Sequence, residues 1–383
     1  MLKFWSYERE YKKNKKKILN LIDKSISSGS IFFGKNLTKF EKNFTTKYNS
    51  RYGIAVGSGT DALLISLMAI GIKEGDEVIT AANTAIPTIS AIISSGARPV
   101  LVDINNDDYL ININDLENKI TKRTKVIIPV HLYGQSANMK KIMVMSKKYK
   151  IHIIEDCAQA QGAKYNNTFV GTFGTFGCFS FYPTKILGAY GDGGFIFTQN
   201  YELYKKIKRI RFYGIETVDN KNKFKGKYYA NEDGINSRLD EIQATILNFK
   251  LNKTNNFINR RRKIAKIYLK ELKSTNLQLP TEGKNKKHVY HLFTVFHKQA
   301  PQLIRLLKKE KIQTRVIYPY PIHIMKAYKN LSSKKKGLQN SRNKAKGIFC
   351  LPLYPEMLDI EVLRICRIIK KILYKKKFSY KAT

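Results

Sequence analysis

Several features are scarce or missing in this 383-residue sequence. The chain has only four cysteines, and their spacing fits neither a metal site nor a disulfide framework, so we expect reduced packing residues and no bound metal; they are Cys157, Cys178, Cys350 and Cys366. No apolar run reaches the ~20 residues that a membrane-spanning helix needs. The first residues, MLKFWSYEREYKKNKKK, have no apolar signal core. We therefore expect a cytoplasmic protein without a membrane partner.

Acidic residues are also scarce, because 29 Asp and Glu stand against 70 Lys and Arg and leave a net charge of +41. A basic chain raises the question of nucleic acid. The lysines are spread along the whole sequence, however, and no nucleic-acid-binding motif is present. Net charge bears on solubility and non-specific binding rather than on fold. We interpret the excess as compositional drift and predict no nucleic-acid partner; a basic nucleic-acid-binding protein that has lost catalysis is a distant alternative.

Short apolar runs alternate with amphipathic segments from Tyr52 onward. This alternation predicts a mostly parallel sheet in an α/β fold. The strands that we expect are Tyr52–Val56, Glu77–Thr80, Pro99–Val102, Lys125–Val130, Ile151–Glu155, Phe176–Phe181 and Phe195–Thr198. Binding sites in such sheets lie at the carboxyl ends of the strands.

The second half of the chain changes in composition. Val218–Tyr229 is polar and is predicted to be a loop, and a long helix is expected to begin at Asn236 and continue to about Lys273. A strand at Val289–Phe296 and a helix at Pro301–Glu310 then indicate a smaller α/β unit. We predict a large domain over residues 1–250 and a smaller C-terminal domain over residues 251–383.

Lys185 is the first candidate catalytic residue. It follows a predicted strand and Pro183, and a glycine-rich loop comes after it. A lysine in a confined, partly desolvated place has a lowered pKa and suits Schiff-base chemistry. In a chain so rich in lysine, a solvated loop lysine is the simpler interpretation of this residue alone.

Two further stretches strengthen the case for Lys185. Asp156 stands at the mouth of a predicted buried strand, where an acid needs a partner, and the protonated ring nitrogen of pyridoxal phosphate (PLP) would supply one. Ser58, Gly59 and Thr60 stand between a strand and a helix, where backbone N–H groups and hydroxyls form an anion cradle. The phosphate cradle, the acid and the lysine therefore follow one another in one chain.

The motifs GSGTDALL, IIEDCAQAQGA, SFYPTK…GAYGDGG and GINSRLDEIQA, with VHLYGQ between them, resemble the DegT/DnrJ/EryC1/StrS sugar aminotransferases over roughly residues 25 to 330. The resemblance implies an aspartate-aminotransferase-like PLP fold (fold type I). ANTAIPT and YPTKILGAYGDGG look more like the subgroup that aminates C3 of a dTDP-3-keto-6-deoxyhexose for surface polysaccharide or glycoconjugate. Relatives that aminate C4 tend to carry a TTGEGG-like stretch instead.

The resemblance also assigns roles to residues that are ambiguous by themselves. It places Gln159 on the phenolic oxygen of PLP, Ser180 on its phosphate, and Asn236 on the phosphate of the neighbouring subunit in an obligatory homodimer. Without it, Gln159 is a surface amide, Ser180 a buried hydroxyl and Asn236 a helix cap. Candidate substrate contacts are Tyr182, Arg238, Tyr318, Tyr320 and His323, although each tyrosine has core packing as an alternative; His131 is better explained by a packing or a surface role.

This chain departs from the family pattern at two positions. Gln161 replaces a histidine, and Ala85 stands where many relatives stack an aromatic ring on the cofactor. We predict a transaminase that moves an amino group, from L-glutamate, onto a nucleotide sugar, with Lys185 and Asp156 as catalytic residues. A C4 aminotransferase is the main alternative. A PLP-dependent sugar dehydratase is disfavoured because such relatives replace the lysine by histidine.

Overall fold

The computed structural model describes residues 1–216, 229–331 and 337–374, so the predicted loop Val218–Tyr229 lies outside the described residues except at its last position. A seven-stranded sheet has the order β1-β9-β8-β5-β4-β2-β3, and β9 alone runs antiparallel to its neighbours. The strands are β1 (Tyr52–Val56), β2 (Glu77–Ala81), β3 (Arg98–Val102), β4 (Thr124–Ile128), β5 (His152–Asp156), β8 (Phe176–Ser180) and β9 (Gly194–Thr198). The predicted mostly parallel α/β sheet is confirmed.

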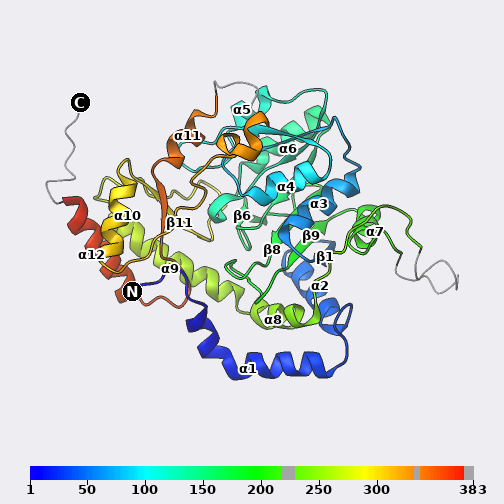
Figure 1. The fold of residues 1–383 in the computed structure, drawn as a ribbon, viewed down its shortest axis with the longest axis horizontal. Coiled ribbons are helices and arrows are strands. Elements are labelled where there is room, and N and C mark those ends of the chain that lie inside the picture. The colour runs from blue at the N-terminus through cyan, green and yellow to red at the C-terminus, as the bar shows by residue number, and fades with distance from the viewer. Residues whose placement is uncertain (217–228, 332–336, 375–383) are drawn as a thin grey trace.

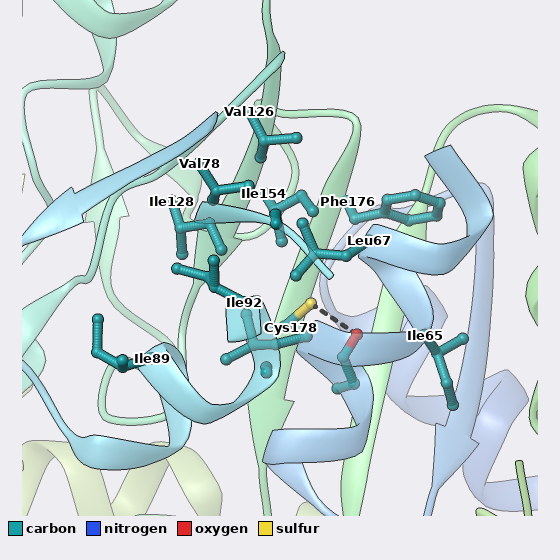
Figure 2. Close-up of a cluster of buried hydrophobic side chains, with 14 of the residues drawn as sticks. Ile65, Leu67, Val78, Ile89, Ile92, Val126, Ile128, Ile154, Phe176 and Cys178 are labelled. Atoms are coloured by element: carbon teal, nitrogen blue, oxygen red, sulfur yellow. Dashed lines mark hydrogen bonds between the residues drawn. The ribbon is translucent and has the colours of Figure 1, made fainter. Parts of the chain in front are cut away.

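One face of the sheet is covered by α3 (Gly59–Ile70) and α4 (Ile86–Ser94). Figure 2 shows their side chains meeting Ile154, Phe176 and Cys178 from the strands in a buried apolar cluster. Helix α3 begins where the Ser58 hydroxyl accepts a hydrogen bond from the Asp61 N–H, and it ends at Gly71 in the left-handed conformation, as a glycine stop predicts.

The opposite face carries a cluster rich in phenylalanine. Side chains alternate along a strand, so Cys178 points to the first face and Phe179 to the second, and Ile196 and Phe197 divide in the same way. Helices α2 (Lys35–Lys47) and α8 (Glu241–Leu251) cover this second face. Strands β8 and β9 are therefore buried on both faces of the sheet. This burial fixes their register, and with it the place where the loop after each strand begins.

A separate apolar cluster holds the C-terminal part together. It joins α9 (Thr254–Leu272), α10 (Ala300–Lys309) and α12 (Asp359–Tyr374) to the antiparallel pair β11 (Phe293–Phe296) and β12 (Ile348–Leu351). Figure 1 shows these elements gathered to one side of the main sheet, next to the N-terminus. The domain boundary near residue 250 stays a prediction.

The expected continuous helix from Asn236 to Lys273 is wrong. Helix α8 begins only at Glu241, because the side chain of Asp240 caps it by accepting from the Gln243 N–H at 2.7 Å. Asn252 and Lys253 then separate α8 from α9. The strand predicted over Val289–Phe296 is also shorter, since β11 begins at Phe293.

The remaining elements surround these two parts. They are α1 (Tyr7–Ser27), α5 (Ile113–Asn118), α6 (Met139–Tyr149), α7 (Tyr201–Ile210), α11 (Gln339–Ala345) and a small sheet of β6 (Lys164–Tyr165), β7 (Thr168–Phe169) and β10 (Lys286–Lys287). Short 3-10 turns lie at Leu132–Gly134, Ile322–Ile324 and Lys326–Leu331. Within the described ranges, no helix has the length and apolarity to cross a membrane.

Candidate active site

A cavity of about 590 Å³ opens at the carboxyl ends of β1, β5 and β8. It brings together most of the residues that the sequence analysis singled out, from segments far apart in the chain. The predicted residues in its lining are Ser58, Gly59, Thr60, Asp156, Gln159, Ser180, Tyr182, Lys185, Tyr318 and Tyr320. Ala85 also lines it, together with Ile86, Pro87 and Thr88 at the start of α4.

The N-terminus of α3 forms one end of this cavity. The first N–H groups of the helix have no carbonyl partner within it; the Ser58 hydroxyl takes that of Asp61, and those of Gly59 and Thr60 are available to an anion. Gly59 is needed here, because a Cβ at this position would lie 2.7 Å from the Cβ of Ser180. Ser237 holds the segment from Gly57 to Asp61 in place, because its hydroxyl donates to Asp61 Oδ2 at 2.7 Å and accepts from the Gly57 N–H at 2.8 Å.

Asp156 ends β5 and is only 5% exposed. Its Oδ2 accepts a hydrogen bond from the Thr88 hydroxyl at 2.9 Å, and its Oδ1 accepts from the Ala158 N–H at 3.1 Å. The Thr84 hydroxyl lies 3.2 Å from that of Thr88. Thr88 was not predicted as a site residue, although it stands in the quoted NTAIPT motif.

Lys185 lies in a tight turn directly after β8. Its N–H donates to the Tyr182 carbonyl at 2.8 Å, and the Ala189 N–H closes the loop onto the Phe181 carbonyl at 2.8 Å. Gly188 permits this turn, because a Cβ there would lie 2.4 Å from the Pro183 carbonyl oxygen. Burial lowers the pKa of Lys185 to about 8, while the charge of Asp156 opposes the shift. About a tenth of this amine is therefore unprotonated at pH 7, far more than for an ordinary lysine, and the unprotonated amine is the form that a nucleophile requires.

A second cavity, of about 660 Å³, shares part of its lining with the first, including Lys185. Gln159, Tyr182, Lys185 and Tyr318 line both cavities, and Trp5, Tyr7, His291, Gln313 and Arg315 help to enclose the second one. The lysine thus lies where two spaces meet, one with the anion cradle and one without. This arrangement provides room for a cofactor and for a second reactant next to one amine.

His291 is a residue that the sequence analysis missed. It is 5% exposed, and its Nδ1 has no hydrogen-bond partner among the described residues. Burial, with smaller contributions from the charges of Lys185 and Arg261, keeps the pKa of His291 well below its ordinary value, so the ring is neutral. A lone histidine in VYHLF carries no sequence signal that would have identified it.

Gln159 is held on both sides of its amide. Its Oε1 accepts from the Tyr133 N–H at 2.8 Å, and its Nε2 donates to the Tyr318 hydroxyl at 2.7 Å. These two bonds fix the amide at the junction of the cavities and leave one N–H of Nε2 free for a further acceptor.

Three predicted residues do not line either cavity of the single chain. Asn236 is exposed and pairs through its backbone with Phe212, and the guanidinium of Arg238 lies over the Phe32 ring at 4.5 Å. His323 is buried and accepts a hydrogen bond from Arg342 Nε at 2.9 Å.

The acid next to Asp156 has a structural task. Glu155 is fully buried and accepts backbone N–H bonds from Gly171, Phe173 and Gly174 at 2.7 to 2.9 Å. His131 is fully buried and its Nε2 lies 3.0 Å from the same carboxylate, so of the packing and surface roles expected for it the structure shows the buried one. Cys157 completes a cluster of metal-ligand types with these two residues. The carboxylate is already saturated by hydrogen bonds, so these residues form an anchor for the 171–174 loop.

Comparison with known proteins gives the same assignment along nearly the whole chain. Residues 12–370 match the DegT/DnrJ/EryC1/StrS aminotransferase family. The dTDP-3-amino-3,6-dideoxy-alpha-D-galactopyranose transaminase of Aneurinibacillus thermoaerophilus is 39% identical over 98% of this chain and 100% of its own length. The dTDP-3-amino-3,4,6-trideoxy-alpha-D-glucose transaminase of Micromonospora megalomicea subsp. nigra is 37% identical over 92% of this chain and 94% of its own.

A solved structure supports both the fold and the cofactor. The NtdA protein of Bacillus subtilis, crystallised with bound cofactor PMP, superimposes with a TM-score of 0.85 and 30% identity over 96% of this chain and 83% of its own. The fold and the lysine-centred cavity therefore define a PLP-dependent aminotransferase. The chain belongs to the DegT/DnrJ/EryC1/StrS family, whose members aminate nucleotide sugars.

The residues of the first cavity fit PLP. The helix N-terminus, with its close Gly59–Ser180 approach, suits a phosphate, and the buried carboxylate of Asp156 suits a protonated ring nitrogen. Ala85, on the wall of this cavity, is the small residue expected there in place of a stacking aromatic ring.

Proposed function

We propose that this enzyme transfers an amino group from L-glutamate onto C3 of a dTDP-3-keto-6-deoxyhexose. The observation that carries the proposal is the position of Lys185, a lysine of lowered pKa between an anion-binding cavity and a second cavity of similar size. The choice of C3 and of a dTDP sugar rests on the GAYGDGG loop and on the names of two relatives, both of which are dTDP-3-amino-sugar transaminases.

Residues of this chain would perform four tasks in this reaction. Ser58, Gly59, Thr60 and Ser180 hold the phosphate of PLP, and Asp156 holds a proton on the ring nitrogen, which makes the ring an electron sink when PLP is bound. Lys185 would hold the cofactor through its amine, and the same amine, when free, would move the proton at the carbon that carries the nitrogen. Gln159 donates its free N–H to the phenolic oxygen.

The two-cavity arrangement supports the second cavity as the place where the reactants bind. Tyr182 and Tyr318 line both cavities, so they would contact a reactant that reaches from the second cavity toward the cofactor in the first. Arg315 adds a positive charge to the second cavity, in keeping with an anionic substrate. We propose that the amino donor and the nucleotide sugar occupy this space in turn, next to the amine of Lys185.

The test of this function is a panel assay. Purified enzyme with L-glutamate is incubated with 3-keto and 4-keto nucleotide sugars carrying dTDP, UDP or GDP, and the position of the new amino group is assigned by NMR. We expect amination at C3 of the dTDP-linked 6-deoxyhexoses. Amination at C4, or preference for another nucleotide, would overturn the substrate assignment while leaving the reaction class intact. No amination in any arm would contradict the function itself.

We also propose that the active enzyme is a homodimer in which Asn236 completes the partner's phosphate site. In the described chain its exposed side chain makes no hydrogen bond, and the neighbouring Ser237 supports the phosphate loop of its own chain. An interface of this kind is two-fold and self-complementary. Each active site would then need residues from two chains.

Mixing two inactive variants tests this shared site. Lys185→Ala and Asn236→Ala subunits, allowed to exchange, place both lesions in one site of each mixed dimer and neither in the other. Activity should therefore return in proportion to the mixed-dimer fraction, which differently tagged chains measure. Exchange without recovery would show that Asn236 acts within its own chain.

A further inference from the structure

Gln161 is a fully buried amide that contacts the segment carrying Lys185 at two places. Its Nε2 donates to the Ser180 carbonyl at 2.7 Å and to the Leu187 carbonyl at 3.1 Å. Its Oε1 accepts from the Leu187 N–H at 3.0 Å. Ser180 ends β8 and Leu187 follows Lys185 by two residues, so one side chain joins both ends of the turn that presents the lysine.

Each of these bonds pairs the buried amide with a backbone group of the turn. Both N–H groups and the oxygen of the amide are engaged, so the side chain satisfies two carbonyls and one N–H at once. A neutral amide makes these bonds at every pH. A histidine, which the family resemblance implies for this position, has only two ring nitrogens, and it changes charge near neutral pH.

We propose that Gln161 is a positioning residue for Lys185, whose three hydrogen bonds hold the lysine turn in its reactive geometry independently of pH. The proposal rests on the proposed role of Lys185. The cofactor linkage is therefore mapped first by borohydride reduction. A label on another lysine would contradict the role of Lys185, whereas a label on Lys185 confirms that role and allows Gln161 to be tested separately.

The decisive variant is Gln161→Glu, which keeps the shape of the side chain. A protonated glutamic acid donates to one of the two carbonyls and still accepts from Leu187. An ionised one directs negative charge at both carbonyl oxygens, and burial among them raises the pKa of the new carboxyl. The turn should therefore hold its geometry at low pH and lose it as the pH rises through the pKa of the glutamate.

The measurement is the rate at which the apoenzyme links PLP covalently, divided by the wild-type rate at the same pH. The ratio removes the titration of Lys185 itself. We expect the Gln161→Glu ratio to fall about tenfold or more between pH 6 and pH 9, since the loss of one or two hydrogen bonds corresponds to a factor of this size. The conservative Gln161→His variant keeps one donor and one acceptor while its ring is neutral, so above about pH 8 it should stay within about threefold of wild type.

Gln135 provides a matched control. It is 3% exposed, its Nε2 donates to the Thr281 carbonyl at 3.0 Å, and its Oε1 accepts from the Gly283 N–H at 2.7 Å. Gln135→Glu therefore introduces the same buried charge conflict in a segment that does not carry the lysine. It should lower the melting temperature without a pH-dependent change in the linkage ratio.

Two results would overturn the proposal: a Gln161→Glu ratio that does not change with pH, or equal ratios in Gln161→Glu and Gln135→Glu. If Gln161→Glu does not fold, Gln161→Met replaces it. Methionine fills the same space without hydrogen bonds, and we then expect slow linkage at all pH values while Gln161→His stays close to wild type above about pH 8. Equal linkage rates in the methionine and histidine variants above that pH would contradict the positioning role.

Discussion

Removal of the Thr88 hydroxyl tests the electrostatic half of the site. Thr88→Val keeps the shape of the side chain but deletes the 2.9 Å hydrogen bond to Asp156, which then retains only the Ala158 N–H at 3.1 Å. A hydrogen bond to a charged group contributes about 1.5–3 kcal/mol. If Asp156 is needed to stabilise the transition state, kcat should fall about 10- to 150-fold.

The assay is steady-state transamination, with thermal unfolding as a check on the fold. Thr84→Val is the matched control. Since the Thr88 proton is directed at Asp156, the Thr84 hydroxyl donates to Thr88, and its loss leaves the bond to Asp156 in place. We expect no more than about a threefold effect for Thr84→Val and near-wild-type activity for Thr88→Ser. A Thr88→Val enzyme as active as Thr84→Val would refute the reasoning.

Three further predictions concern the same site. Asp156→Asn should lower kcat by roughly 10³-fold or more, and a loss below about tenfold would mean that another group protonates the ring. Because the pKa of Lys185 is about 8, the rate of PLP linkage to the apoenzyme should rise with pH up to about that value and level off above it, as the fraction of free amine does. Stopped-flow absorbance measures this rate, and a profile that does not change with pH would contradict the amine as the titrating group. Glu155→Gln should lower the free energy of unfolding by about 2–4 kcal/mol in denaturant titration, since an amide has only one oxygen to offer the loop; an unchanged midpoint would contradict the anchor.

The core of the site was predictable because its signals are local. Asp156 and Ser180 end strands, Ser58 caps a helix, and the rules for the carboxyl ends of parallel strands place them at one edge of the sheet. The turn of Lys185 follows from Pro183 and the glycines beyond it. These parts of the site depend on short segments whose conformation the sequence largely determines.

Contacts between distant segments could not be predicted in this way. Thr88 meets Asp156 from 68 residues away, and the neutral His291 reaches the Lys185 side from the C-terminal part. The wrong prediction of a helix start at Asn236 has a similar cause. Its segment reads as the start of a helix, but Ser237 binds the loop at Gly57 and Asp61, so the helix begins only after Asp240. Tertiary hydrogen bonds outweighed local propensity there.

Mapping of the covalent cofactor linkage tests the central claim most directly. The holoenzyme is reduced with borohydride and digested, and the modified peptide is sequenced by mass spectrometry. The chain has 55 lysines, so many amines compete for an aldehyde, and chance attachment would spread over several surface positions. We predict one stoichiometric label on Lys185, and its loss when L-glutamate is added before reduction. A label on another lysine, or one that L-glutamate does not remove, would contradict the account.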